Sequence, residues 1–166
     1  ISTACTRTEF VGTTILDTIG LVISGIDDTL RITEADLCDR AKLEIHDSIM
    51  TTGDQNADAQ FTADLNGEDC ACNIVSRTVA RDHSKQHYTS TLNGNNRCAG
   101  HTECDSILMD QAYVLATPQL SAATTEASLI HEAAIGKIAG EQLIKLMTLG
   151  LTEEEAEEQI ISGFLK

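Results

Sequence analysis

The sequence predicts a mainly β protein, with a parallel β-helix over residues 1–130 and a short α-helical segment over residues 131–166. Three observations support this fold class. Short motifs recur at a regular interval, apolar and polar side chains alternate through most of the chain, and the C-terminal part changes to helical spacing. Together they indicate a solenoid of stacked strands with a helical end.

The repeat is clearest in the middle of the chain. The motif TADLNG at 62–67 returns as TSTLNG at 89–94, and the same shift takes Phe61 to Tyr88. Three aspartates recur at nearly the same interval: Asp54, Asp82 and Asp110. A fixed interval of this size is typical of solenoids, whose units bury their apolar sides only against neighbouring units. We therefore expect coils of about 27–28 residues, within the range of known solenoid repeats.

The repeated units are predicted to be strands. Apolar residues alternate with polar ones, as at Leu30 and Ile32 or at Leu43 and Ile45, and the turn pairs NG and GD separate such segments. Parallel strands that wind as a β-helix place each coil about 4.8 Å from the next. Residues separated by one repeat should therefore lie directly above one another.

From about Lys137 the apolar residues take up the spacing of an amphipathic helix. They are Leu143, Leu146 and Met147, followed by Gly150 where the helix should end. Thr152 then opens the sequence TEEE, which is typical of a capping box completed by Glu155. A second helix should follow, with one apolar side formed by Ala156, Ile160, Ile161 and Phe164.

The composition narrows the functional classes. Lys and Arg total 11 against 26 Asp and Glu, giving a net charge of −15, and 3% of residues are aromatic. Nucleic-acid binding is disfavoured, because it needs a basic face and usually aromatic stacking. No run approaches the ~20 apolar residues of a membrane span. The six cysteines are too sparse for a disulfide framework and favour a reducing compartment.

The pair His131–Glu132 is the strongest candidate for metal chemistry. It does not begin a zinc-protease HExxH motif, because Ile135 stands where the second histidine is needed. The repeat interval instead places Cys104 directly beneath His131 or Glu132 on the adjacent coil. Thiolate, imidazole and carboxylate groups converging there suit iron, zinc or an iron–sulfur cluster. His101 is left out of this site, because residues three apart on a strand face opposite sides.

Four other residues with reactive side chains favour simpler interpretations. Cys70 and Cys98 are one repeat apart and should form a column of small buried side chains rather than a disulfide. His83 and His87 are expected in a surface turn, where they would not share a metal.

Two stretches resemble the C-terminal part of SufB and SufD, the scaffold proteins of the Suf iron–sulfur cluster assembly system. They are CDSILM at 104–109 and the long run at 131–164 that begins HEAAIGKI; the segment at 76–92 is similar to the family's penultimate coil. The HE pair is more similar to SufB than to SufD, which more often has HG. The resemblance implies a right-handed parallel β-helix followed by helices, in a cytoplasmic protein, and we expect the chain to be part of a longer scaffold.

The resemblance also implies cofactor, partners and site residues. Family members build a transient iron–sulfur cluster as a homodimer or a SufB/SufD-type heterodimer, receive sulfur from donor proteins and bind the ABC ATPase SufC. Cys104 matches the SufB cysteine implicated in sulfur acceptance and cluster building, and Glu132 matches an acidic residue implicated as a ligand, preceded by His131. SufC should dock on the helices through Leu143, Met147, Ile160 and Phe164. The chain itself is not expected to be an enzyme, because it lacks a GxxxxGK[ST] phosphate loop.

Two alternatives stay open. The chain could be a cluster-free module that docks SufC and a second scaffold subunit, in which case a Cys104→Ala change would be tolerated. It could instead be a zinc-dependent hydrolase that uses Cys104 and His131 as ligands and Glu132 as base. The sequence offers no convincing third protein ligand for such an enzyme.

Overall fold

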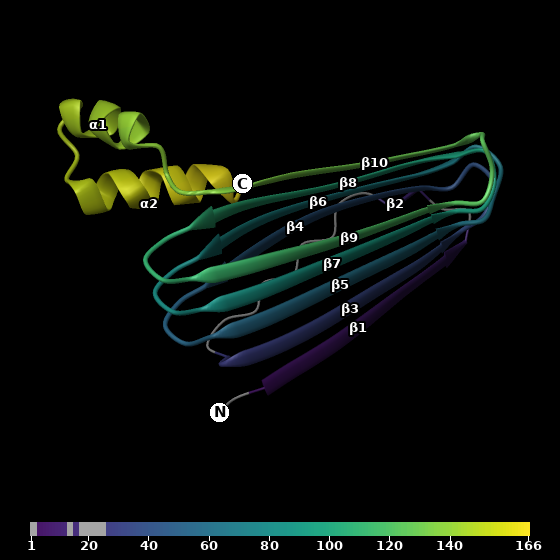
Figure 1. The fold of residues 1–166 in the computed structure, drawn as a ribbon, viewed down its shortest axis with the longest axis horizontal. Helices are drawn as coiled ribbons and strands as arrows, with labels where there is room; N and C mark the ends of the chain where they lie inside the picture. The colour runs from purple at the N-terminus through teal and green to yellow at the C-terminus, as the bar shows by residue number, and fades with distance from the viewer. Residues whose placement is uncertain (1–2, 13–14, 17–25) are drawn as a thin grey trace.

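The structure is a computed structural model that describes residues 3–12, 15–16 and 26–166 of the chain. These residues form a parallel β-solenoid of two facing sheets, followed by two helices (Figure 1). The chain alternates between the two sheets, so that each coil adds one strand to each sheet. The predicted fold class is confirmed.

The first sheet has the order β1 (Thr3–Gly12), β3 (Asp28–Leu37), β5 (Asn56–Leu65), β7 (Lys85–Gly94), β9 (Tyr113–Ala122). The second has the order β10 (Ala127–Gly136), β8 (Cys98–Leu108), β6 (Cys70–Ala80), β4 (Lys42–Thr51), β2 (Ile15–Leu16). The helices are α1 (Gly140–Thr148) and α2 (Glu153–Phe164). Strand β10 runs through residue 131, where we predicted the helical segment to begin, and helical structure starts at Gly140.

Alternating side chains fill the narrow space between the sheets. Leu43 and Ile45 are buried there, as predicted, together with Phe61 and Leu65. In β3 the predicted arrangement is reversed at its first half, because Leu30 and Ile32 lie on the outer face and the buried positions next to them are the polar Arg31 and Thr33. The core therefore contains polar residues as well as apolar ones.

Arg31 is the clearest of these buried polar residues. Its guanidinium forms an ion pair with Asp47, which is also buried, and lies 5.2 Å from the centre of the Phe61 ring. A charge can be enclosed at this position because a carboxylate and an aromatic face both compensate it.

The register between coils varies by a single residue from β3 onward. Thr62 pairs with Thr91 and Leu65 with Gly94. The TADLNG and TSTLNG motifs therefore do not stack residue on residue, because the strands are two residues out of step with the sequence match. The predicted repeat is correct between β6 and β8, where Cys70 pairs with Cys98. Phe61 and Tyr88 are diagonal neighbours, with ring centroids 5.5 Å apart.

The recurring aspartates mark the turns at the helical end of the solenoid. Asp82 and Asp110 have φ values of 58° and 55°, and the equivalent residue one coil earlier is Gly53 rather than Asp54, with φ of 59°. The carboxylates link successive turns, because Asp82 accepts the Gly53 N–H at 2.7 Å and Asp110 accepts the Asp82 N–H at 3.2 Å. Aspartate tolerates this left-handed conformation better than most residues.

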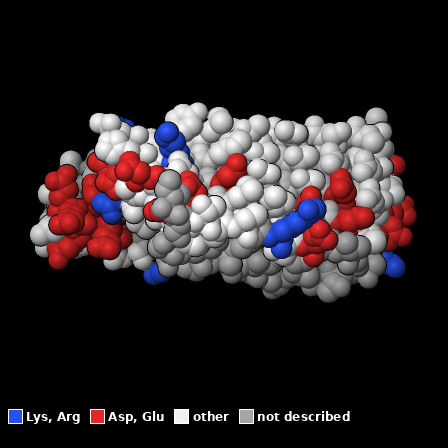
Figure 2. All heavy atoms as spheres, turned by 90° about the horizontal axis from the view of Figure 1, so that it is seen from below, with Lys and Arg blue, Asp and Glu red and all other residues white. Residues whose placement is uncertain are grey.

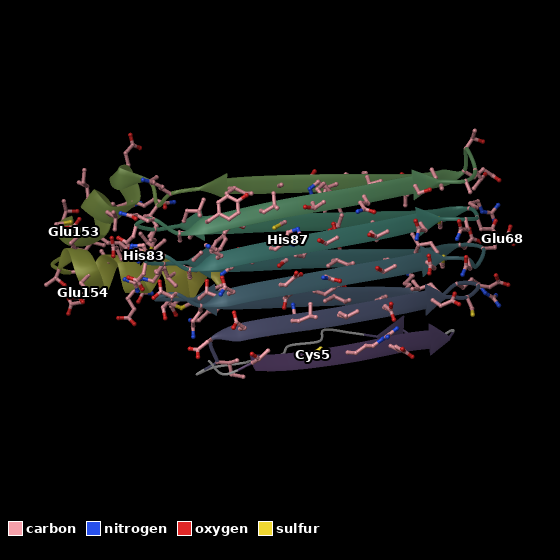
Figure 3. All side chains as sticks on the ribbon, turned by 60° about the horizontal axis from the view of Figure 1, so that its bottom comes forward. Cys5, Glu68, His83, His87, Glu153 and Glu154 are labelled. Atoms are coloured by element: carbon pink, nitrogen blue, oxygen red, sulfur yellow. The ribbon has the colours of Figure 1, made fainter. Side chains whose placement is uncertain are left out.

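His83 and His87 are not neighbours in one turn. Figure 3 shows His83 at the helical end of the molecule, whereas His87 lies along β7 on the outer face of the first sheet. The imidazole of His87 is 3.6 Å from the Asp58 carboxylate and 3.1 Å from the Thr117 hydroxyl. The expected surface turn is therefore correct for His83 only.

Both predicted helices are present with their predicted ends. Gly150, at φ 100°, follows α1, and the Thr152 side chain accepts the Glu155 N–H while Glu155 accepts the Thr152 N–H at 2.8 Å. Two contacts tie the end of α2 to the second sheet: Ser48 donates to the Leu165 carbonyl at 2.9 Å and Arg77 to that of Phe164 at 3.4 Å. Across the described residues, neither helix has the length and apolar character needed to span a membrane.

Candidate metal site

The structure separates the three predicted ligands. The register between β8 and β10 places Cys104 beside Ala133 rather than beside His131 or Glu132. Successive side chains of a strand face opposite sides, which places His131 on the interior side with Cys104 and Glu132 on the outer face. The predicted register is therefore wrong. The physical reason is that this coil is one residue longer than the coil below it, which joins β6 and β8.

Cys104 is fully enclosed between the sheets. It stacks on Ser76, which in turn stacks on Asp47, and its Sγ lies 3.9 Å from the Ser106 hydroxyl. Burial raises the pKa of the Cys104 thiol, and the carboxylates of Asp105 and Asp47 add to this effect. The thiol is therefore protonated at neutral pH. It would become a ligand only if a metal displaced its proton, or if the coil above it moved and exposed it.

His131 is half-buried and carries an unsatisfied ring nitrogen. It pairs in register with Thr102, whose hydroxyl hydrogen-bonds to Tyr88 at 3.0 Å. The Nδ1 atom of His131 is buried and has no hydrogen-bond partner within the described part of the chain. Buried polar atoms of this kind are uncommon and call for an explanation. A ring nitrogen that is buried without a partner, next to the strand that carries Cys104, is compatible with a metal ligand.

The spacing of Cys104 and His131 would let them share either a single ion or a polynuclear group. They sit on adjacent strands, two residues out of step, so their Cα atoms are roughly 8 Å apart by ordinary strand dimensions. Side chains that extend toward each other from that distance can bring their ligand atoms within the ~4.4 Å that two bonds of about 2.0–2.3 Å to one ion require.

Glu132 lies with a different group of side chains. Its carboxylate, the His101 imidazole and the Glu103 carboxylate offer ligand atoms that all lie within 4.8 Å of one another on the outer face of the second sheet. Sequence reasoning excluded His101 because it opposes Cys104, and that orientation is correct. The signal it missed was the two-residue step from His101 to Glu103, which puts both on the face of Glu132.

The predicted column of Cys70 and Cys98 is confirmed by the register, and both side chains are buried as free thiols. Burial raises the pKa of Cys70, and the neighbouring Cys98 adds to the effect. These two thiols form part of the hydrophobic core.

The four residues predicted to dock SufC lie on the helical pair. Leu143, Ile160 and Phe164 are half-buried, and Met147 is 43% exposed. Ile144 and Leu149, which the helical pattern did not single out, are more exposed at 63% and 73%. The apolar surface available to a partner is therefore largest on α1.

The fold defines a parallel β-solenoid protein, a class in which stacked coils form a frame and function lies in the side chains placed on it. The family model described as SUF system FeS cluster assembly, SufBD core domain, matches residues 30–164. The chain belongs to this SufBD family, as the sequence resemblance predicted.

Three relatives illustrate the similarity. A SufBD family protein of Methanothermobacter thermautotrophicus is 41% identical over 103 residues, covering 61% of this chain and 25% of the relative. One from Pyrococcus horikoshii is 35% identical over 132 residues, with coverage of 79% and 40%. The Bacillus subtilis protein named iron-sulfur cluster assembly protein SufB is 34% identical over 97 residues, with coverage of 56% and 21%. The chain thus spans less than half the length of these relatives.

Proposed function

We propose that this chain is part of a non-catalytic cytoplasmic scaffold on which iron and sulfide assemble into a transient iron–sulfur cluster. The observation that supports it most is that Cys104 and the unsatisfied Nδ1 of His131 both lie on the interior side, on the adjacent strands β8 and β10. Thiolate is the usual ligand of iron–sulfur clusters, and imidazole replaces it in some of them. Such a mixed ligand set would release a finished cluster more readily than four thiolates.

Access to Cys104 requires strand β10 to move. This strand covers Cys104 through Ala133 and is the last of its sheet, so among the described strands it hydrogen-bonds only to β8. The same movement is what would bring Glu132, the third proposed ligand, from the outer face toward the cluster. A strand at the end of its sheet has one hydrogen-bonded neighbour instead of two, so it can be displaced at a lower cost than an inner strand.

The open end of the solenoid is the proposed surface for a second scaffold subunit, either identical or of the SufB/SufD type. Leu120 continues the interior column above Leu92, and Ile135 the one above Ser106, yet they are 42% and 44% exposed because no further coil covers them. Exposed strand edges with apolar side chains are normally covered by a partner.

The helical pair is the proposed docking surface for the SufC ATPase. Ile144, Met147 and Leu149 expose apolar surface on α1, next to the acidic first turn of α2. Figure 2 shows acidic side chains gathered over this end of the molecule. An apolar patch with an acidic border suits a partner with an apolar patch and a basic border. Because α1 begins soon after β10, a partner that pulls on the helices also pulls on the strand above Cys104.

Anaerobic reconstitution of the full-length protein tests the proposal. Iron and acid-labile sulfide per chain would be measured for the wild type, Cys104→Ala and His131→Ala, with Cys70→Ala as the matched buried-cysteine control. We expect cluster in the wild type and the control, none in Cys104→Ala and a reduced amount in His131→Ala. Equal loading of Cys104→Ala and wild type would exclude Cys104 from the site.

One observation favours the alternative of a cluster-free docking module, namely the complete burial of Cys104. That module predicts no cluster in any variant and unchanged binding of SufC by Cys104→Ala. The zinc-hydrolase alternative is disfavoured, because Glu132 faces away from Cys104 and His131 and so would not reach a water on a metal held between them.

A further inference from the structure

We infer that His101, Glu103 and Glu132 form a binding site for a first-row divalent transition-metal ion on the outer face of the second sheet. The site is separate from the interior side chains of Cys104 and His131. It does not rest on the proposed function, since a protein that builds no cluster could hold the same ion.

The geometry suits an ion placed between two strands. Strand β8 supplies His101 and Glu103, and β10 supplies Glu132, with all three ligand atoms within 4.8 Å of one another. The Nε2 atom of His101 is 3.8 Å from the nearer Glu132 oxygen, which is too long for a hydrogen bond. Two metal–ligand bonds of about 2.1 Å span that distance with an open angle at the metal.

A hydrogen-bond chain outside the cluster prepares His101 as a ligand. The Asn73 amide donates to Glu44 at 3.4 Å, which turns its carbonyl oxygen toward His101, and this oxygen lies 2.8 Å from Nδ1. Nδ1 must therefore carry the proton, so the lone pair of neutral His101 is on Nε2, facing the two glutamates. Metal-binding histidines characteristically donate their second N–H to an oxygen in this way.

The site gathers more carboxylates than cationic groups. Glu103 and Glu132 offer oxygen atoms within 4.8 Å of each other, and strand alternation places Asp105 on the same face. Within residues 26–166, no lysine or arginine forms an ion pair with Glu103 or Glu132. A bound cation would relieve the repulsion between these carboxylates.

The ligand types indicate the class of ion. One imidazole and two carboxylates suit Fe²⁺, Mn²⁺, Co²⁺ or Zn²⁺, whereas Mg²⁺ and Ca²⁺ prefer sites made of oxygen alone. The absence of a thiolate separates this site chemically from Cys104.

Anaerobic equilibrium dialysis of the full-length protein against Fe²⁺ alone, without sulfide and at fixed salt, tests the inference. We expect a bound iron in the wild type whose affinity falls about tenfold or more in His101→Ala and in Glu132→Gln. His87→Ala, which removes a strand histidine beside a carboxylate on the other sheet, is the matched control and should bind as the wild type does. Cys104→Ala shows whether the iron binds at the interior thiol instead. Thermal unfolding of each variant checks that the fold is intact.

Equal Fe²⁺ binding by His101→Ala and the wild type would overturn the inference, and so would iron that depends on Cys104 instead. The two proposals fail separately. If His101-dependent iron is present but reconstitution yields no Cys104-dependent cluster, the scaffold proposal fails and the outer site stands; the opposite pair of results removes the outer site alone.

Discussion

Asn73 illustrates how a side chain that would not contact the metal can position one of its proposed ligands. It lies between Glu44 and His101, one strand away from the proposed metal ligands, and it holds the His101 ring by a hydrogen bond of 2.8 Å. Its place in the middle of a strand ladder fixes its own orientation. It is a positioning residue rather than a ligand.

Replacing Asn73 by leucine removes the acceptor that fixes the His101 tautomer. We expect the affinity for Fe²⁺ to fall roughly tenfold, which is the lower end of the effect of losing such a partner. Dialysis as above measures it, and the histidine ring nitrogen signals in NMR spectra should show the mixed tautomers directly. Asn93→Leu, which removes a half-buried asparagine bonded to Asp64 at 2.8 Å on the other sheet, is the control. Unchanged ring nitrogen signals in Asn73→Leu would contradict the assigned role.

At the scale of the element, α2 depends on its first turn. The capping box joins Thr152 and Glu155, and the hydrogen bond from the Thr152 N–H is the largest cause lowering the pKa of the Glu155 carboxyl group. Because this pKa is lower in the folded protein than in the unfolded chain, the ionised group stabilises the fold above its ordinary pKa. That contribution is lost as the pH falls through the folded value.

Thr152→Ala should therefore destabilise the docking of α2 by about 1 kcal/mol at neutral pH, the usual cost of losing a helix cap. Glu155→Gln removes the ionisable group instead, so the difference between this variant and the wild type should shrink as the pH falls below 4.5. Hydrogen exchange of the α2 amides between pH 4 and pH 7 would detect both effects. Thr124→Ala, in a turn at the other end, should leave α2 unchanged, and equal protection of α2 in Thr152→Ala and wild type would refute the role of the box.

How much of an element the sequence reveals depends on what fills its interior side. Leu43 and Ile45 follow the simple rule that apolar residues face inward, so that strand was predicted correctly. In β3 the rule fails because Arg31 finds Asp47 across the interior, a partner that only the folded chain brings near. The C-terminal helices were predictable because caps and helical spacing are local features.

The candidate site was less predictable than the fold for a related reason. A motif match reveals the repeat length to within one or two residues, which suffices to recognise a solenoid. Side-chain direction, however, reverses with every residue, so an uncertainty of one residue changes which groups meet. Cys104 and His131 lie on the interior side of adjacent strands, whereas Glu132 lies on the outer face beside His101 and Glu103.

At the scale of the whole molecule, the helices lie at one end of the strands and the last coil is left open (Figure 1). Strands β9 and β10 end their sheets, and both carry apolar residues with substantial exposure. A second subunit stacked there would complete the interior as one more coil would.

Charge at the open end should therefore prevent pairing of subunits. We expect Leu120→Arg and Ile135→Glu each to shift the full-length protein from dimer to monomer, as measured by light scattering coupled to size-exclusion chromatography. Met50→Glu is a suitable control, because Met50 is equally exposed, at 43%, but lies on β4 away from the end. A dimer that persists in both open-end variants would show that the subunits pair elsewhere.

The turn at residues 123–126 has an influence that reaches beyond its own short length. This turn is one residue longer than the corresponding turn of the coil below, so β10 begins one residue later. As a result, the imidazole of His131 faces the interior and the carboxylate of Glu132 faces outward. Deleting one residue there would exchange the two, hiding Glu132 and presenting His131. The length of this turn therefore determines which of the two side chains faces the interior. Relatives with the same histidine and glutamate could differ in the metals they bind through this length alone, without changing a ligand.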